Sequence, residues 1–151
     1  MDIILIAAIT ADGFIARHEN DPVTWSEDLH VFKEQTMGFP IIMGSNTAKT
    51  IDKELEGRKI IVVHRDDEPK MILENIKAKK CFIAGGGRTN TMFAPFLTHL
   101  YLTIHPIVFG KGIPLFTGLE EQLFLELIKA VDVVPGKGII QYQYKSQKKK
   151  M

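Results

Sequence analysis

Three clusters of glycine, hydroxyl and basic residues in this sequence could hold a phosphate group. The run Gly85-Gly86-Gly87-Arg88-Thr89 lies between an apolar segment and a helical pattern. Glycines let the backbone approach a ligand closely, and the first turn of a helix offers unpaired N–H groups to an anion. Gly44-Ser45-Asn46-Thr47 and His64-Arg65 also follow apolar segments. Taken alone, the glycine run is also consistent with a tight turn, the second cluster with a helix cap, and Arg65 with a solvated surface side chain. The three together predict a site for a nucleotide cofactor.

Asp28 is the residue whose position best suits proton transfer. It lies at the start of a helical pattern, next to Leu29 and four residues before Phe32, so its carboxyl falls on the apolar stripe. The structural alternative is an acid that complements the helix dipole. A carboxylate directed at a core is costly unless it is hydrogen-bonded. A bound heterocycle with ring N–H groups would supply those bonds.

Neither the histidines nor the cysteine predict a metal site. The five histidines show no paired spacing such as HExxH, and we expect His105 to be a structural residue in or beside a strand. The single cysteine, Cys81, lies in an apolar run, which predicts a buried core residue. One cysteine also excludes a disulfide within the chain. We therefore expect no metal.

The order of apolar segments predicts an α/β fold that brings the three clusters to one edge of a sheet. Strands are expected at residues 3–10, 40–43, 59–64, 81–84 and 100–108, followed by two long strands at 122–134 and 138–144. Helices are expected from 24 or 26 to 37 and at 45–51, 71–78 and 88–97. This alternation predicts a mostly parallel central sheet with an antiparallel C-terminal hairpin. Ligands of such sheets bind outside the carboxyl ends of the strands.

The start of the first helix carries two competing signals. Thr24 and Glu27 have the spacing of a capping box, and Ser26 is the alternative N-cap. The polar stretch before them, residues 17–24, is expected to be a loop.

Length and composition predict one domain. The chain has 151 residues, of which 45% are hydrophobic and 25% charged, with a formal net charge of +1. We expect a domain over residues 1–145 and a disordered basic tail over 146–151. The charge gives no reason to expect a nucleic-acid or membrane partner. No apolar run approaches the ~18 residues of a spanning helix and no signal peptide is evident, so we expect a cytoplasmic protein. Surplus apolar positions over 123–134 allow a homodimer.

Five motifs, in order, resemble those of dihydrofolate reductases. They are DLHVFK at 28–33, PIIMG at 40–44, GRKII at 57–61, GGGR at 85–88 and LYLT at 100–103. Two further segments, TADGFIA at 10–16 and HPIVFGKGIPLF at 105–116, look like the reductase domain of bifunctional riboflavin-biosynthesis enzymes, which shares that fold. The resemblance implies a three-layer fold of the dihydrofolate-reductase type and an NADPH-dependent oxidoreductase acting on a small-molecule substrate.

The resemblance also implies roles for individual residues. Asp28 would hold the substrate ring and help deliver a proton, with Thr103 as its hydrogen-bond partner. Arg58 would meet an acidic group on the substrate, and the substrate pocket would be walled by Leu29, Phe32 and Ile51. The implied cofactor-binding residues are Ala8, Ile15, Ala16, Gly44, Ser45, Asn46, Thr47, His64, Arg65, Gly85, Gly86, Gly87, Arg88 and Thr89. Of these, Gly86 to Thr89 would cradle the pyrophosphate, and Arg65 would face the adenosine 2′-phosphate that distinguishes NADPH from NADH. Ala8, Ile15 and Ala16 would border the nicotinamide, the last two on a mobile loop.

Three interpretations of function stay open at this point. Asp28, Thr103 and Arg58 favour reduction of a dihydropterin such as dihydrofolate. The segment 107–116 favours reduction of the aminouracil ribosyl phosphate of riboflavin synthesis. The third interpretation is a non-catalytic nucleotide-binding protein that retains the fold. It draws support from Ser45, where a dihydrofolate reductase usually has an arginine, and from Asn90, where an aromatic residue is expected.

Overall fold

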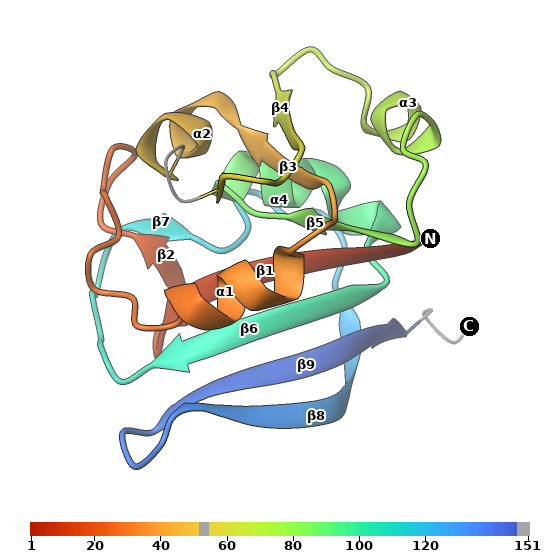
Figure 1. Cartoon of the computed structure of the whole chain (residues 1–151). Coiled ribbons are helices and arrows are strands. Elements are labelled where there is room, and N and C mark those ends of the chain that lie inside the picture. The colour runs from red at the N-terminus through yellow and green to blue at the C-terminus, as the bar shows by residue number, and fades with distance from the viewer. Residues whose placement is uncertain (52–54, 148–151) are drawn as a thin grey trace.

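A seven-stranded sheet runs through the middle of the structure (Figure 1), a computed structural model that describes residues 1–51 and 55–147. Its strands follow the order β4-β3-β5-β1-β6-β9-β8. Their bounds are β1 (Asp2–Thr10), β3 (Ile41–Gly44), β4 (Ile60–Val63), β5 (Lys80–Ile83), β6 (His99–His105), β8 (Phe124–Val134) and β9 (Ile139–Gln147). The pairs from β4 to β6 are parallel, and β9 is antiparallel to both β6 and β8. The fold class predicted from the sequence is confirmed.

The helices cover both faces of this sheet and complete three layers. They are α1 (Leu29–Thr36), α2 (Ser45–Ile51), α3 (Pro69–Glu74) and α4 (Gly87–Phe93), with a 3-10 turn, η2 (Ala94–Phe96). Neighbouring residues of β1 face opposite sides, because side chains alternate along a strand. Ile4 belongs to the apolar cluster that packs against α1 and α2, whereas Leu5 belongs to the cluster that includes residues of α3 and α4. Both residues are at most 1% exposed, which is why the continuous apolar run forms a central strand.

The start of α1 differs from the prediction, and neither proposed cap is formed. The helix begins at Leu29, and Asp28 is its N-cap residue without a side-chain capping bond. The Ser26 hydroxyl instead donates to the carbonyl of Val23, in a turn where Val23 has a φ of 56°. The N–H of Glu27 is taken by Nε2 of His105, at 3.0 Å. A partner 78 residues away therefore sets this helix start, which local spacing could not reveal.

Several other element ends also differ for local reasons. Strand β6 stops at His105, because Pro106 cannot donate to a ladder. Pro95 divides the predicted helix 88–97 into α4 and η2. Helix α3 starts earlier than predicted, with Pro69 at its first turn, and ends at Glu74. A two-stranded sheet of β2 (Phe14–Ala16) and β7 (Ile113–Pro114) was not predicted, because its strands are too short to show alternation.

The C-terminal strand β9 reaches Gln147, so residues 146 and 147 belong to the sheet and not to the predicted tail. Residues 148–151, which hold the three terminal lysines, lie outside the described residues. Cys81 is fully buried, and burial raises the pKa of its thiol to about 11, as expected of a core residue. Within the described ranges, no helix combines the length and apolarity needed to cross a membrane.

Candidate active site

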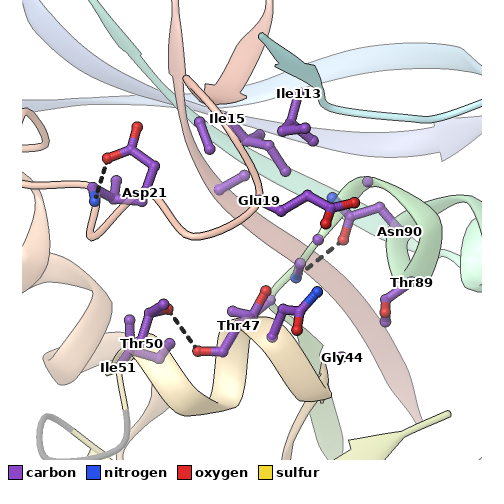
Figure 2. A pocket seen from close by; sticks show the side chains of 18 of the residues that line it. Ile15, Glu19, Asp21, Gly44, Thr47, Thr50, Ile51, Thr89, Asn90 and Ile113 are labelled. Carbon is purple, nitrogen blue, oxygen red and sulfur yellow. Dashed lines mark hydrogen bonds between the residues drawn. The ribbon is translucent and has the colours of Figure 1, made fainter.

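A cavity of about 850 Å³ opens at the carboxyl ends of the parallel strands. Its walls come from residues 6–8 of β1, from β2, from the loop 18–26 and from the turns that follow β3, β4 and β5. Helix α1 contributes one side and α2 the other, and Figure 2 shows Thr47, Thr50 and Ile51 of α2 along one wall. The cavity falls within the size range of small-molecule sites and lies where open parallel sheets bind ligands.

Two strand-to-helix turns lie against each other at one end of the cavity. The N–H of Gly44 donates to the carbonyl of Gly85 at 2.9 Å, which joins the turn after β3 to the turn after β5. The peptide bond between Gly85 and Gly86 is cis, and Gly85 has a φ of 92°. A β-carbon on Gly44 would lie only 2.9 Å from the hydroxyl of Thr89, so the close approach of the two turns requires glycine there. Both turns were predicted to be ligand-binding, and both line the cavity.

Asn90 holds the second of these turns in place. Its Oδ1 accepts the N–H of Gly85 at 3.1 Å, the bond drawn in Figure 2, and its Nδ2 donates to the carbonyl of Leu115 at 2.9 Å. The side chain is 1% exposed and also contributes to the cavity wall. An amide at this position therefore has a structural function of its own, which sequence reasoning could not anticipate.

Asp28 lies in the opposite part of the cavity wall, only 7% exposed. Burial raises the pKa of its carboxyl above the ordinary value of 3.8, while Thr103 and His105 act in the opposite direction. Thr103 is completely buried beside it, and its hydroxyl forms no hydrogen bond of good geometry within the described residues. Asp28 is therefore a largely desolvated acid that keeps its proton to a higher pH than an exposed aspartate does.

His105 connects this acid to the end of β6. It is 1% exposed, and its Nε2 accepts the Glu27 N–H, so its Nδ1 carries the proton that faces the carbonyl of Thr103 at 3.1 Å. Its ring meets the edge of Trp25, with centroids 5.2 Å apart. The expectation of a structural histidine in or beside a strand is confirmed, and its contacts fix the backbone that carries Asp28.

The loop 17–24 contributes residues to the cavity wall that were not predicted from the sequence. Asp21 is 3% exposed and accepts the N–H groups of Arg17 at 2.8 Å and Val23 at 3.0 Å. Burial alone would raise the pKa of Asp21, but these two bonds, together with the nearby charges of Arg17 and His18, keep the pKa below the usual value. Glu19 also lines the cavity and points into it (Figure 2). Aspartate often stabilises a turn by accepting the N–H of the residue two positions later. Asp21 was therefore the one signal in the sequence for an ordered turn in this loop.

The structure brings nearly all of the predicted site residues to this one cavity. The residues in its wall are Asp28, Leu29, Phe32, Ile51, Ala8, Ile15, Ala16, Gly44, Ser45, Asn46, Thr47, His64, Arg65, Gly85, Gly86, Gly87, Arg88 and Thr89. Thr103 lies buried behind the wall and Arg58 lies outside it. No group of three or more His, Cys, Asp or Glu residues is arranged to hold a metal ion among residues 1–51 and 55–147.

Arg58 is engaged at the C-terminal end of α1. Its Nε donates to the hydroxyl of Thr36 at 3.0 Å, and its two terminal nitrogens donate to the carbonyls of Glu56 at 2.8 Å and Lys33 at 2.6 Å. Cations at this end of a helix complement its dipole. These bonds account for three of the five donors of the guanidinium.

The parallel sheet, the paired glycine turns and the buried acid define a protein of the dihydrofolate-reductase-like class. The chain belongs to the dihydrofolate reductase family, whose model, described as dihydrofolate reductase, matches residues 2–124. It is 31% identical over 117 residues to dihydrofolate reductase type 3 of Salmonella typhimurium, a match that covers 68% of this chain and 71% of that protein. It is 30% identical over 113 residues to dihydrofolate reductase of Bacillus subtilis (strain 168), with 67% of each chain covered.

Two solved structures share the fold over nearly the whole chain. Dihydrofolate reductase from Enterococcus faecalis, complexed with NADP(H) and RAB-propyl, superposes with a TM-score of 0.76 at 22% identity and covers 97% of both chains. A structure described as a riboflavin biosynthesis protein from Shewanella sp. PV-4 gives a TM-score of 0.65 at 20% identity, covering 98% of this chain and 100% of that one. The resemblance to both groups that the sequence motifs indicated is confirmed at the level of fold.

Proposed function

We propose that this protein is an NADPH-dependent reductase that adds a hydride to a C=N bond, in a heterocycle or a ribosyl imine, while Asp28 handles the accompanying proton. The observation that carries the proposal is the position of Asp28: a buried acid in the wall of the same cavity whose other end is formed by the two glycine turns. Membership of the dihydrofolate reductase family supports the same reaction class.

The residues around the glycine turns fit a dinucleotide. A β-carbon on Gly86 would meet only the hydroxyl of Thr47, 3.7 Å away, so the glycine leaves space on the cavity side of the turn. Two exposed arginines, Arg65 and Arg88, stand at the cavity wall, and guanidinium groups suit phosphates. Gly86 to Thr89 would hold the pyrophosphate, and Arg65 the 2′-phosphate that makes NADPH the preferred cofactor. When bound, NADPH supplies the hydride.

The raised pKa of Asp28 suits the chemistry of the other substrate. Hydride addition to the carbon of a C=N bond places negative charge on the nitrogen, which must then be protonated. A desolvated carboxyl holds a proton at a pH where an exposed aspartate has lost it. Leu29 and Phe32 line the cavity wall next to Asp28 and would exclude water from the same region.

We propose dihydrofolate or a related dihydropterin as the first candidate substrate, because the family model covers most of the chain. The aminouracil ribosyl phosphate of riboflavin synthesis is the second, and one observation favours it. Arg58, the cation expected to meet the acidic tail of a folate, lies outside the cavity wall with three of its donors engaged at α1.

The test is NADPH consumption, followed by its near-ultraviolet absorbance, with each substrate supplied in turn. We expect turnover with one of the two and at least ~10²-fold slower turnover in Asp28→Asn, the usual scale for a positioned proton-transfer group. Glu27→Gln is the matched control, because Glu27 is an exposed neighbouring acid. If the protein bound NADPH but turned over neither substrate, the non-catalytic interpretation would replace this proposal.

A further inference from the structure

Strand β8 leaves a long apolar edge of the main sheet uncovered. It is the last strand in the sheet order, paired only with β9 among the described residues, and it lies at the side of the molecule away from the helices (Figure 1). Residues 124–130 are all exposed, and Phe124, Leu127 and Ile128 remain 43%, 54% and 50% exposed. Soluble proteins usually protect such an edge with charges, prolines or a covering segment, because it can pair with another strand.

When two copies of residues 124–131 are placed antiparallel, apolar residues lie opposite apolar residues and opposite charges lie opposite each other. Phe124-Leu125-Glu126-Leu127 reads apolar, apolar, acidic, apolar, and Ile128-Lys129-Ala130-Val131 reads apolar, basic, apolar, apolar. In an antiparallel pair of two copies centred between Leu127 and Ile128, every apolar residue therefore faces an apolar residue. Glu126 then faces the partner's Lys129, and the symmetric pair is formed on the other side of the centre. Opposite charges directly across a ladder are stabilising.

A β-bulge in β8 makes this pairing geometrically consistent. In a regular strand residues 126 and 129 point to opposite faces, because side chains alternate. Here Glu126 lies opposite Lys145 and Lys129 opposite Gln143, with the register shifting between Leu127 and Lys129. Lys145 and Gln143 are two apart on β9 and share a face, so Glu126 and Lys129 share one as well. A two-fold axis perpendicular to the sheet preserves that face and can bring the two charges together.

We propose that this protein forms a two-fold symmetric homodimer in which β8 pairs antiparallel with β8 of a second copy. The two sheets join at this edge, and Leu125 lies opposite the partner's Ala130 on the other face of the ladder. The partner that pairs with β8 is a second copy of the chain, because the pattern of charged and apolar residues is complementary to itself. In addition, Lys129 forms no ion pair elsewhere in the described ranges. No residue of β8 lines the cavity, so the dimer is independent of the proposed reaction.

The experiment measures the mass in solution by size exclusion with light scattering over a range of micromolar concentrations. The dimer has twice the chain mass of 17.0 kDa. Lys129→Glu places an acid against Glu126 at both symmetric positions, and we expect it to raise the dimer dissociation constant about ten-fold or more. Adding Glu126→Lys together with Lys145→Glu in the same chain restores opposite charges across both ladders and should restore the dimer. The double variant Lys70→Glu/Glu74→Lys, in the exposed face of α3, is the control and should remain dimeric.

Lys129→Glu is the chosen single variant because Glu126 also faces Lys145 of its own chain, so Glu126→Lys alone would disturb the hairpin. Thermal melts identify any variant that fails to fold. A monomeric wild type, or a dimer whose dissociation constant Lys129→Glu leaves unchanged, would overturn the proposal.

Cysteine crosslinking tests the register itself. Residues directly opposite across an antiparallel ladder have Cα atoms within the range of a disulfide. The variant Leu125→Cys/Ala130→Cys should therefore crosslink two chains under mild oxidation. The control Leu125→Cys/Asp132→Cys shifts the pair by two residues and should not. Crosslinking of the control in preference to the first pair would contradict the pairing centred between Leu127 and Ile128.

Discussion

Asp28 is held in the cavity wall at a cost in stability, because burial disfavours its charged form. The folded protein binds this proton more tightly than the unfolded chain does, since the folded pKa is raised above 3.8. The stabilisation that the folded state gains from binding this proton is therefore complete below pH 3.8, and it is lost as the pH rises through the raised pKa of Asp28. Above that value the ionised, buried carboxyl is a net penalty.

Asp28→Asn removes a carboxyl that must otherwise ionise in a buried place. We expect the variant to melt at a higher temperature than the wild type at neutral pH, and the difference to shrink as the pH falls toward 3.8. Thermal unfolding across this pH range measures it. Asp12→Asn is a control of opposite sign, because the Thr10 hydroxyl and the N–H groups of Gly110 and Phe109 lower the pKa of Asp12. Its melting temperature should fall at neutral pH. A constant difference between Asp28→Asn and wild type at all pH values would refute the buried-acid description.

The sequence predicted the burial of Asp28 from its spacing to Phe32, and the family resemblance indicated Thr103 beside it, but neither indicated the contact of His105 with Glu27. Helical periodicity is a local property, whereas His105 reaches Glu27 from 78 residues away. The contacts of Arg58 could not be predicted for the same reason. Its partners Thr36 and Lys33 are 22 and 25 residues away, at the end of a helix whose position depends on the whole sheet. Such tertiary contacts leave no pattern in a single sequence.

At the scale of elements, Gly86 and Gly87 in the turn between β5 and α4 are expected to serve different functions. A β-carbon on Gly86 would meet only Thr47, at an ordinary 3.7 Å, whereas one on Gly87 would approach the carbonyl of Pro114 to 2.8 Å. We expect Gly86→Ala to keep its melting temperature but to lose affinity for NADPH, because the methyl group occupies the cavity side. Gly87→Ala should lower the melting temperature, because the backbone around β7 must shift. Titration of NADPH fluorescence and thermal unfolding separate the two effects. Equal loss of stability in both variants would contradict the assignment.

The beginning of α1 depends on one histidine acceptor. His105→Phe keeps a ring against Trp25 but leaves the Glu27 N–H without its partner. This hydrogen bond is part-buried, and a typical intramolecular hydrogen bond contributes about 0.5–1.5 kcal/mol, so chemical denaturation should show a loss of that size in the free energy of unfolding. His30→Gln, at an exposed position of the same helix, should leave it nearly unchanged. A fully stable His105→Phe would show that this bond does not hold the helix start.

The longer strands were predictable because each has an extended apolar or alternating run in the sequence. The apolar runs of β1, β3 and β5, and the long hairpin of β8 and β9, were found at nearly their observed bounds. The short strands β2 and β7 were not, because two or three residues cannot show alternation and their pairing joins segments about 100 residues apart. That small sheet nonetheless places Ile15 and Ile113 in the cavity wall.

At the scale of the whole molecule, parallel topology explains why residues scattered from Ala8 to Thr89 reach one cavity. The carboxyl ends of β1, β3, β4 and β5 lie at the same edge of the sheet, so Ala8 of β1 and the turns after β3, β4 and β5 reach the same cavity. The acid on α1 joins them because that helix packs next to the same edge. The topology therefore sets the place of the cavity, and the particular side chains of its wall decide the substrate.

A crystal structure of the protein with NADPH tests the central claim most directly. We expect the pyrophosphate at Gly86 to Arg88 and the nicotinamide beside Ala8 and Ile15, with open volume left between that ring and the Asp28 carboxyl. A dinucleotide bound elsewhere, or a nicotinamide placed away from Asp28, would contradict the assignment of this cavity as the site of reduction.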